Sequence, residues 1–153
     1  MFKSILLATD GSPASAHAAQ LAVALARTHG ARLTALYVVD PYPYLGIGET
    51  NPLGFQAYMS AAYAHATQAH ARVTALCGQG GKPVELELRR IEDLHASDGI
   101  LQGAKEAGAD LIVVGSHGRT GLGRLMIGSI AARVVSLSPV PVLVARARPG
   151  ELD

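Results

Sequence analysis

A glycine-rich stretch at residues 115–129 has the composition and spacing in this sequence that best suit a binding site. Its pattern is Gly115, two residues, Gly118, nine residues, and then Gly128-Ser129. Glycines let a backbone approach a ligand closely, and the N–H groups at the start of a helix attract negative charge. The stretch follows an apolar run typical of a buried strand and precedes a helical pattern, so it predicts a site for an anion such as phosphate.

The charges around this stretch agree with an anionic ligand. Residues 111–150 contain no Asp or Glu. The same segment carries five arginines, which are Arg119, Arg124, Arg133, Arg146 and Arg148. The basic character is local, because the whole chain has a formal net charge of only +1.

Length and composition predict a single domain spanning residues 1–153, of which 49% are hydrophobic. The small net charge and the lack of a long basic run give no reason to expect a nucleic-acid partner. No apolar run reaches the length of a signal peptide or a membrane span, so we expect no membrane partner and a cytoplasmic location. The single cysteine, Cys77, excludes an intramolecular disulfide and fits a reducing compartment.

Hydrophobic periodicity and turn residues predict strands alternating with helices, in the order β-α-β-α-β-α-β-α-β. Ser12 is expected to cap the first helix, with Pro13 at its first position and Gly30 at its end. Ser97 is the expected cap of the third helix. The predicted strands are 2–9, 32–39, 84–91, 110–115 and 140–145, and the predicted helices are 14–29, 55–77, 97–107 and 129–137.

This alternation is typical of an α/β protein with an open, five-stranded parallel sheet and helices on both faces. Ligands of such sheets bind beyond the carboxyl ends of the strands, where the strand order reverses. The strands that end at Asp10 and Gly115 carry the most polar and glycine-rich sequence after them. We therefore expect the site between those two ends. The alternating strand 84–91 is expected near a sheet edge, and strand 140–145 is a candidate for pairing with a second copy.

Residues 41–54 contain many prolines and glycines and are predicted to form an irregular loop. Tyr42 and Tyr44 in this loop have two interpretations: they cover a ligand, or they pack on the neighbouring surface.

The spacing of residues 115–129 resembles the nucleotide-binding signature of the universal stress protein family. Three other segments resemble the same family, so the resemblance covers nearly the whole chain. They are KSILLATDGS at 3–12, YVVD at 37–40 and PVPVLV at 139–144. The resemblance implies a Rossmann-like fold with strand order 3-2-1-4-5, membership of the ATP-binding subclass and a homodimer formed through residues 140–145.

The resemblance also implies roles for individual residues. Asp10 would contact the ribose or a Mg²⁺ ion bound to the nucleotide, and the backbone of Val38 would meet the adenine. The glycines and Ser129 would hold ribose and phosphates, with Arg119 and Arg124 as helpers on the phosphate side. The expected nucleotide-binding set is Thr9, Asp10, Val38, Gly115, Ser116, His117, Gly118, Arg119, Arg124, Gly128 and Ser129.

Each of these features also has a structural interpretation. The glycines could form a turn that binds nothing, and Asp10 could be a helix cap or a solvated turn carboxylate. The six histidines lack metal-ligand spacing, and only His117 lies inside the glycine-rich stretch.

The sequence offers a phosphate cradle but no identifiable catalytic base and no G-x-x-x-x-G-K-S/T loop, which favours a nucleotide-binding regulator over an enzyme. The resemblance implies that the nucleotide is ATP and that the protein acts in the stress response. One alternative is a slow ATPase or self-phosphorylating protein with Ser129 or Ser116 as acceptor. Another is a structural stress dimer that binds no nucleotide. A receptor for AMP or a cyclic nucleotide on the same cradle also remains open.

Overall fold

The computed structural model describes residues 1–41, 52–116 and 127–146. Strands and helices alternate through these residues, as the sequence predicts. In chain order the elements are β1 (Ser4–Ala8), α1 (Pro13–His29), β2 (Arg32–Val39), α2 (Pro52–Gly78), β3 (Leu86–Glu92), α3 (Ala96–Ala107), β4 (Leu111–Gly115), α4 (Ser129–Leu137) and β5 (Val142–Ala145).

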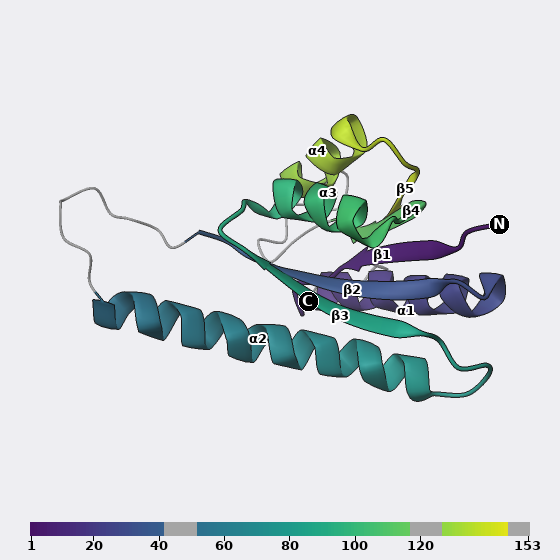
Figure 1. Ribbon diagram of the computed structural model, residues 1–153, viewed down its shortest axis with the longest axis horizontal. Coiled ribbons are helices and arrows are strands. Elements are labelled where there is room, and N and C mark those ends of the chain that lie inside the picture. The colour runs from purple at the N-terminus through teal and green to yellow at the C-terminus, as the bar shows by residue number, and fades with distance from the viewer. Residues whose placement is uncertain (42–51, 117–126, 147–153) are drawn as a thin grey trace.

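The strands form one parallel sheet in the order β3-β2-β1-β4-β5, which confirms the predicted fold class. Helices α1 and α2 cover one face of the sheet, and α3 and α4 cover the other (Figure 1). The chain first builds outward from β1 to β2 and β3, then returns to place β4 on the other side of β1. The strand order therefore reverses at β1, which is where an α/β sheet offers a binding crevice.

Alternate residues of the central strands fill two separate cores, one on each face of the sheet. Ile5 and Leu7 of β1 belong to the core under α1, whereas Leu6 between them belongs to the core under α3 and α4. All three side chains are fully buried. A strand buried on both faces reads as a continuous apolar run, which explains why the Ile5-Leu6-Leu7 sequence contains no polar residue.

Helix α1 begins and ends as its sequence predicts. The Ser12 hydroxyl accepts a hydrogen bond from the backbone N–H of Ser15 at 3.2 Å, and Pro13 takes the first helical position. Gly30 ends the helix with a φ of 65°, a left-handed conformation that glycine adopts without steric cost.

Two predicted helix starts were wrong. Helix α2 begins at Pro52 and not at residue 55, so the predicted irregular loop 41–54 is too long by residues 52–54. Proline is compatible with the first turn of a helix because its missing N–H would have no partner there. Helix α3 begins at Ala96, with His95 as N-cap and Ser97 inside the helix. Residues 42–51 of the loop, including Tyr42 and Tyr44, lie outside the described residues.

The two edge strands are those that the sequence places at or near an edge, with shifted bounds. The third strand runs from Leu86 to Glu92, whereas the prediction was 84–91. The last strand begins at Val142 and not at residue 140, since Pro141 has no N–H to donate to the ladder. The carbonyl of Pro141 still accepts a hydrogen bond from the N–H of Ile112 at 3.0 Å.

Asp110 joins the starts of β1 and β4. Its carboxylate accepts hydrogen bonds from the backbone N–H groups of Lys3, at 2.9 Å, and Ser4, at 3.1 Å. Partial desolvation acts to raise the pKa of Asp110, but these hydrogen bonds outweigh it and hold the pKa below its ordinary value. Asp110 therefore stabilises the fold in its charged form.

Helix α2 is the longest of the described helices, with 27 residues, and its N-terminal part extends beyond the carboxyl ends of β2 and β3 (Figure 1). Its C-terminal end is held by Arg27 of α1. The guanidinium donates to the carbonyls of Cys77 and Gln79, each at 3.2 Å, and to that of Lys82 at 3.0 Å. One side chain thus satisfies the carbonyl of Cys77, which the end of the helix leaves without an intrahelical donor, and two carbonyls in the segment that follows Gly78. None of the helices in the described residues is both long and apolar enough to cross a membrane.

Candidate functional site

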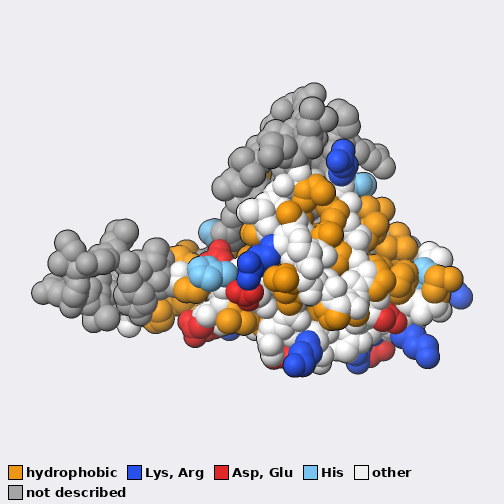
Figure 2. All heavy atoms as spheres, turned by 90° about the horizontal axis from the view of Figure 1, so that it is seen from above, with side chains coloured by type: hydrophobic (Ala, Val, Ile, Leu, Met, Phe, Trp, Pro, Cys, Tyr) orange, Lys and Arg blue, Asp and Glu red, His pale blue; other side chains and the backbone are white. Residues whose placement is uncertain are grey.

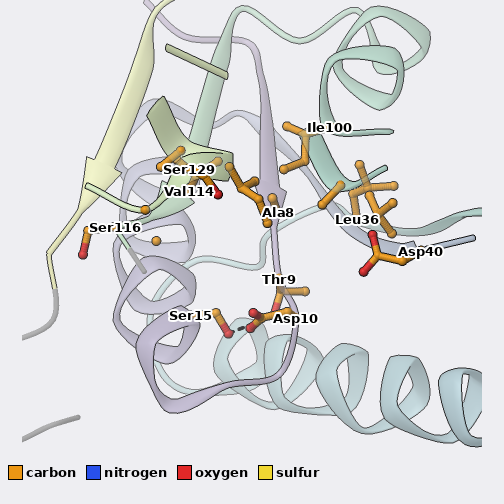
Figure 3. Close-up of a pocket in the computed structure, with 16 residues that line it drawn as sticks. Ala8, Thr9, Asp10, Ser15, Leu36, Asp40, Ile100, Val114, Ser116 and Ser129 are labelled. Carbon is orange, nitrogen blue, oxygen red and sulfur yellow. Dashed lines mark hydrogen bonds between the residues drawn. The ribbon is translucent and has the colours of Figure 1, made fainter. Parts of the chain in front are cut away.

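A cavity of about 320 Å³ opens at the carboxyl ends of β1, β2 and β4, on the side of the sheet that α3 and α4 cover. It lies where the strand order reverses, as the sequence predicts. Figure 3 shows its labelled residues, which come from the ends of these strands and from the first turns of α1, α3 and α4. An apolar part of the lining runs along β2 and α3, whereas polar side chains lie just past the strand ends and backbone N–H groups lie at the start of α4.

The polar lining of the cavity follows from strand periodicity. Side chains two residues apart point to the same face of a sheet, so each strand sends one row toward α3 and α4. These rows are apolar while the helices cover them and become polar just past the end of each strand. They read Leu6-Ala8-Asp10 on β1, Leu36-Val38-Asp40 on β2 and Ile112-Val114-Ser116 on β4.

The start of α4 presents backbone N–H groups to the cavity that have no acceptor within the helix. The first intrahelical hydrogen bond runs from Ala132 N–H to Gly128 C=O at 3.0 Å, which leaves the N–H groups of Ser129, Ile130 and Ala131 without intrahelical acceptors. Gly128 is the N-cap, and as a glycine it has no side chain to cap the helix. All of these residues except Ala132 line the cavity. Together with the helix dipole, these donors suit an anionic group.

A hydrogen bond brings the two ends of the glycine-rich stretch together. Gly128 N–H donates to the carbonyl of Ser116 at 2.7 Å, and Ser116 N–H in turn donates to Ala145 C=O of β5 at 2.8 Å. Residues twelve positions apart in sequence therefore form one wall of the cavity. The spacing predicts a shared site, and in the described part of the structure Gly115, Ser116, Gly128 and Ser129 all line this cavity.

The turn after β1 lines the cavity between the residues of β2 and those of β4, because β1 lies between these two strands. Asp10 Oδ1 accepts a hydrogen bond from Ser12 N–H at 2.9 Å, which is the turn role that the sequence left open for this carboxylate. The same side chain also lines the cavity, and no hydrogen bond reaches its Oδ2 from the residues that the structure describes. Thr9 Oγ1 lies 3.5 Å from Ser15 Oγ, and both residues are buried. Asp10 thus has one oxygen fixed by the turn and one available to a ligand.

Helix α3 closes the apolar part of the cavity by lying very near β2. A Cβ atom added at Gly99 would be 2.7 Å and 2.8 Å from the two Cγ atoms of Val38, and one added at Gly103 would be 2.6 Å from Leu36 Cδ2. These two glycines therefore set how closely α3 approaches the strand. Val38 and Leu36 form the strand side of the apolar wall, and Ile100 forms part of the helix side.

The structure brings seven of the eleven predicted residues to this cavity: Thr9, Asp10, Val38, Gly115, Ser116, Gly128 and Ser129. The other four, His117, Gly118, Arg119 and Arg124, lie outside the described residues. Sequence reasoning missed Asp40 and Ser15, as well as the apolar wall of α3. Asp40 had a usable signal, because it follows Leu36 and Val38 at the same two-residue interval that places Asp10 after Ala8. Within the described ranges, no cluster of three or more His, Cys, Asp or Glu side chains is arranged to hold a metal ion.

Comparison with known proteins connects this geometry to one family. The profile described as "Universal stress protein family" matches residues 1–146. A universal stress protein from Thermus aquaticus is 38% identical over 147 residues, covering 95% of this chain and 100% of that protein. Among solved structures, universal stress protein UspA from Lactobacillus plantarum has a TM-score of 0.78 at 30% identity, covering 94% of this chain and 97% of its own. A universal stress protein in complex with cAMP has a TM-score of 0.66 at 25% identity, covering 95% of this chain and 97% of its own.

Proposed function

The chain belongs to the universal stress protein family, and from that premise we propose that it is a regulator that binds an adenine nucleotide, with ATP as the expected ligand. Binding of the nucleotide in the cavity would favour one conformation or assembly state, which another cellular component would recognise. The observation that carries the proposal is the composition of the cavity, which joins an apolar wall on β2 and α3 to the uncapped start of α4. A nucleotide has the same two ends, an apolar base and an anionic phosphate chain.

The order of groups along the cavity supports one orientation of the nucleotide. The base lies against Val38 on β2, the ribose lies over the end of β1 beside Asp10, and the phosphates meet the N–H groups of Ser129 to Ala131. Gly115 and Gly128 leave room for the ribose and phosphates, while Ser116 and Ser129 add hydroxyl groups at the same wall. The related protein solved with cAMP supports an adenine nucleotide as the ligand class.

Asp10 is the residue that would hold Mg²⁺ bound to the nucleotide. Its Oδ1 is engaged by Ser12, which leaves Oδ2 for the ion or for a ribose hydroxyl. Magnesium in nucleotide sites is commonly held by one or two carboxylates and the phosphates, so this carboxylate suits such a site. When bound, the ion would neutralise part of the phosphate charge.

Calorimetric titration with ATP and Mg²⁺ tests the proposal, and Ser129→Asp provides the informative variant. A carboxylate at the first position of α4 favours the helix but repels phosphate. At a separation of about 5 Å and an intermediate effective dielectric, the repulsion is about 2 kcal/mol, which weakens binding roughly 30-fold.

Ala132→Asp is the matched control, because Ala132 lies on the same helix, is exposed and does not line the cavity. It adds the same charge and should change the affinity for ATP far less. Absence of heat and of a thermal shift in the unmodified protein would contradict nucleotide binding and would favour a structural stress dimer. Equal effects of the two variants would refute the placement of the phosphates.

Turnover is tested with the same protein and γ-labelled ATP. Ser129 is exposed at the cavity, so transfer of the γ-phosphoryl group to its hydroxyl would leave a phosphoserine and release ADP. We propose binding without such turnover. Labelled protein, or ADP above a protein-free control, would support the alternative of a self-phosphorylating protein or a slow ATPase.

We also propose that residues 140–145 mediate a homodimer. Strand β5 is an edge of the sheet, and Leu143 on it is 36% exposed. Nearby α4 exposes Val135 and Leu137, which are 49% and 52% accessible. Figure 2 shows hydrophobic side chains gathered on the face that α3 and α4 form. Exposed apolar side chains beside an edge strand suit pairing with a second copy. Light scattering that gives a mass near 15.8 kDa would reject the dimer.

A further inference from the structure

Asp40 places a carboxylate at the part of the cavity farthest along the sheet from α4. It is the first residue after β2, and it continues the row of Leu36 and Val38 that faces α3. The intervening Tyr37 and Val39 face the opposite way and pack against α2. In Figure 3 the carboxylate of Asp40 points toward the cavity from the side that carries Leu36 and Ile100.

The backbone at Asp40 is fixed by two independent features. The Tyr58 hydroxyl of α2 donates a hydrogen bond to the carbonyl of Asp40 at 2.8 Å. Pro41 follows, and a residue before proline is restricted to an extended conformation. The carboxylate itself has no hydrogen bond or ion pair with any residue that the structure describes, so its oxygens are available to accept from a ligand.

We propose that Asp40 is a specificity-determining residue for the base, accepting a hydrogen bond from the exocyclic amino group of adenine. This inference rests on the proposed function. A carboxylate at neutral pH can only accept hydrogen bonds. A base with a carbonyl oxygen at the same position, such as hypoxanthine or guanine, would bring two acceptors together with no proton between them.

The order of groups along the cavity favours the base over the ribose as the partner of Asp40. The phosphate-binding N–H groups lie on α4, Asp10 lies at the end of β1, and Asp40 lies at the end of β2, on the other side of β1 from β4. A nucleotide with its phosphates at α4 and its ribose over β1 places its base over β2. Val38 and Ile100 on either side of this position supply the apolar surface that the ring needs.

The test compares ATP with inosine triphosphate, in which a carbonyl oxygen replaces the amino group and N1 carries a proton, whereas the ribose and phosphates are unchanged. The unmodified protein should bind ATP about 10- to 100-fold more tightly than inosine triphosphate, the range expected for one hydrogen bond to a charged group. In Asp40→Asn, the side-chain amide can donate as well as accept, so this ratio should fall to about threefold or less.

The ratio is the readout because removing a negative charge near a triphosphate should strengthen the binding of both nucleotides alike. Glu92→Gln is the matched control. It removes one carboxylate at the last residue of β3, the strand beside β2, and Glu92 does not line the cavity. Its ratio should equal that of the unmodified protein. A thermal melt of Asp40→Asn checks that the exposed, nearly isosteric substitution leaves the fold intact.

The possible results separate this inference from the proposed function. Binding of ATP with no preference over inosine triphosphate, or an unchanged preference in Asp40→Asn, would overturn the role of Asp40 and leave nucleotide binding in place. A change in the preference for ATP over 2′-deoxy-ATP, with the base preference unchanged, would assign the carboxylate to the ribose and also overturn it. Failure to bind either nucleotide would overturn both proposals.

Discussion

Substituting Gly99 by alanine tests how the packing of α3 shapes the cavity. The added Cβ would lie 2.7 Å and 2.8 Å from the two Cγ atoms of Val38, whereas carbon atoms in favourable contact are about 3.5–4.0 Å apart. The two side chains must therefore separate by about 1 Å. Val38 is β-branched and has few alternative rotamers, so either it is displaced or α3 moves away from β2.

The size of the effect follows from two opposing contributions. Overpacking a well-packed site costs about 1–3 kcal/mol, and alanine gains about 1 kcal/mol over glycine inside a helix. With overpacking near 2 kcal/mol, Gly99→Ala should lower the free energy of unfolding by about 1 kcal/mol. For a domain of this size, that corresponds to a melting temperature lower by roughly 2–4 °C.

A double-mutant cycle with Val38→Ala isolates the contact. The smaller side chain removes the Cγ atoms that the new methyl group would meet, so only the gain in helix propensity remains. Gly99→Ala should then stabilise the Val38→Ala protein, although it destabilises the unmodified one. Gly78→Ala is the control, because a Cβ there has no neighbour within 4 Å, and it should not destabilise the protein.

Urea unfolding of the four proteins of the cycle gives the coupling free energy, expected at about 2 kcal/mol. Because Val38 lines the cavity, Gly99→Ala should also weaken ATP binding in the calorimeter. If Gly99→Ala has the same effect on stability in both backgrounds, the close approach of α3 to Val38 is not what this glycine permits, and the reasoning fails.

Three further substitutions test the contacts of Arg27, the charge of Asp110 and the proposed dimer interface. Arg27→Met should lower the free energy of unfolding by about 2 kcal/mol, because it removes charged donors from the carbonyl of Cys77 in the last turn of α2 and from that of Lys82 after the helix. Urea unfolding measures this, and an effect below about 0.5 kcal/mol would refute it. Asp110→Asn should destabilise by about 1 kcal/mol at pH 7, because the charged carboxylate accepts from the N–H groups of Lys3 and Ser4. The pKa of Asp110 is lowered in the folded state, so the carboxylate's contribution to stability is present above the pKa of the unfolded chain, near 4, and is lost as the pH falls through the pKa of the folded protein. A difference in stability between the unmodified protein and Asp110→Asn that stays constant from pH 7 to pH 2 would contradict this. Leu143→Lys should shift the proposed dimer toward monomer in light scattering, and an unchanged mass at low micromolar concentration would place the interface elsewhere.

Much of the fold could be predicted because its signals are local and repeated. Apolar runs such as Ile5-Leu6-Leu7 indicate strands buried on both faces, and Ser12-Pro13 with Gly30 marks both ends of α1. The helix starts were harder, because proline occurs both in loops and in first helical turns. Pro52 followed by Gly54 therefore looked irregular, although the structure continues α2 through both residues.

The site was predictable where spacing in the sequence reflects a strand end. Asp10 and Ser116 come directly after apolar rows, and both line the cavity. Asp40 has the same relation to β2, but from the sequence it was included only in the segment YVVD and was assigned no binding role. The three rows of side chains that end in a polar residue lie together at the carboxyl ends of the strands. This can be recognised only from the strand order, which brings β2 and β4 to the two sides of β1.

Other contacts have no signal in the sequence because they join distant segments. Arg27 reaches the carbonyl of Lys82, 55 residues away, and nothing in the local sequence of either residue indicates the pairing. From the sequence alone, Gly99 and Gly103 are only residues of low helix propensity. Their role, to let α3 approach Val38 and Leu36 of β2 closely, follows from the structure. Packing of this kind is set by tertiary geometry and not by periodicity.

The most direct test of nucleotide binding in this cavity is a comparison of amide chemical shifts in ¹⁵N-labelled protein titrated with ATP and with adenosine. Both ligands should shift the amides of Val38 and Ala96, which lie at the base end of the cavity. Only ATP should strongly shift the amides of Ser129, Ile130 and Ala131, because only ATP carries phosphates to the start of α4. Saturable shifts confined to residues away from these two regions, or no shifts at millimolar ATP, would contradict nucleotide binding in this cavity.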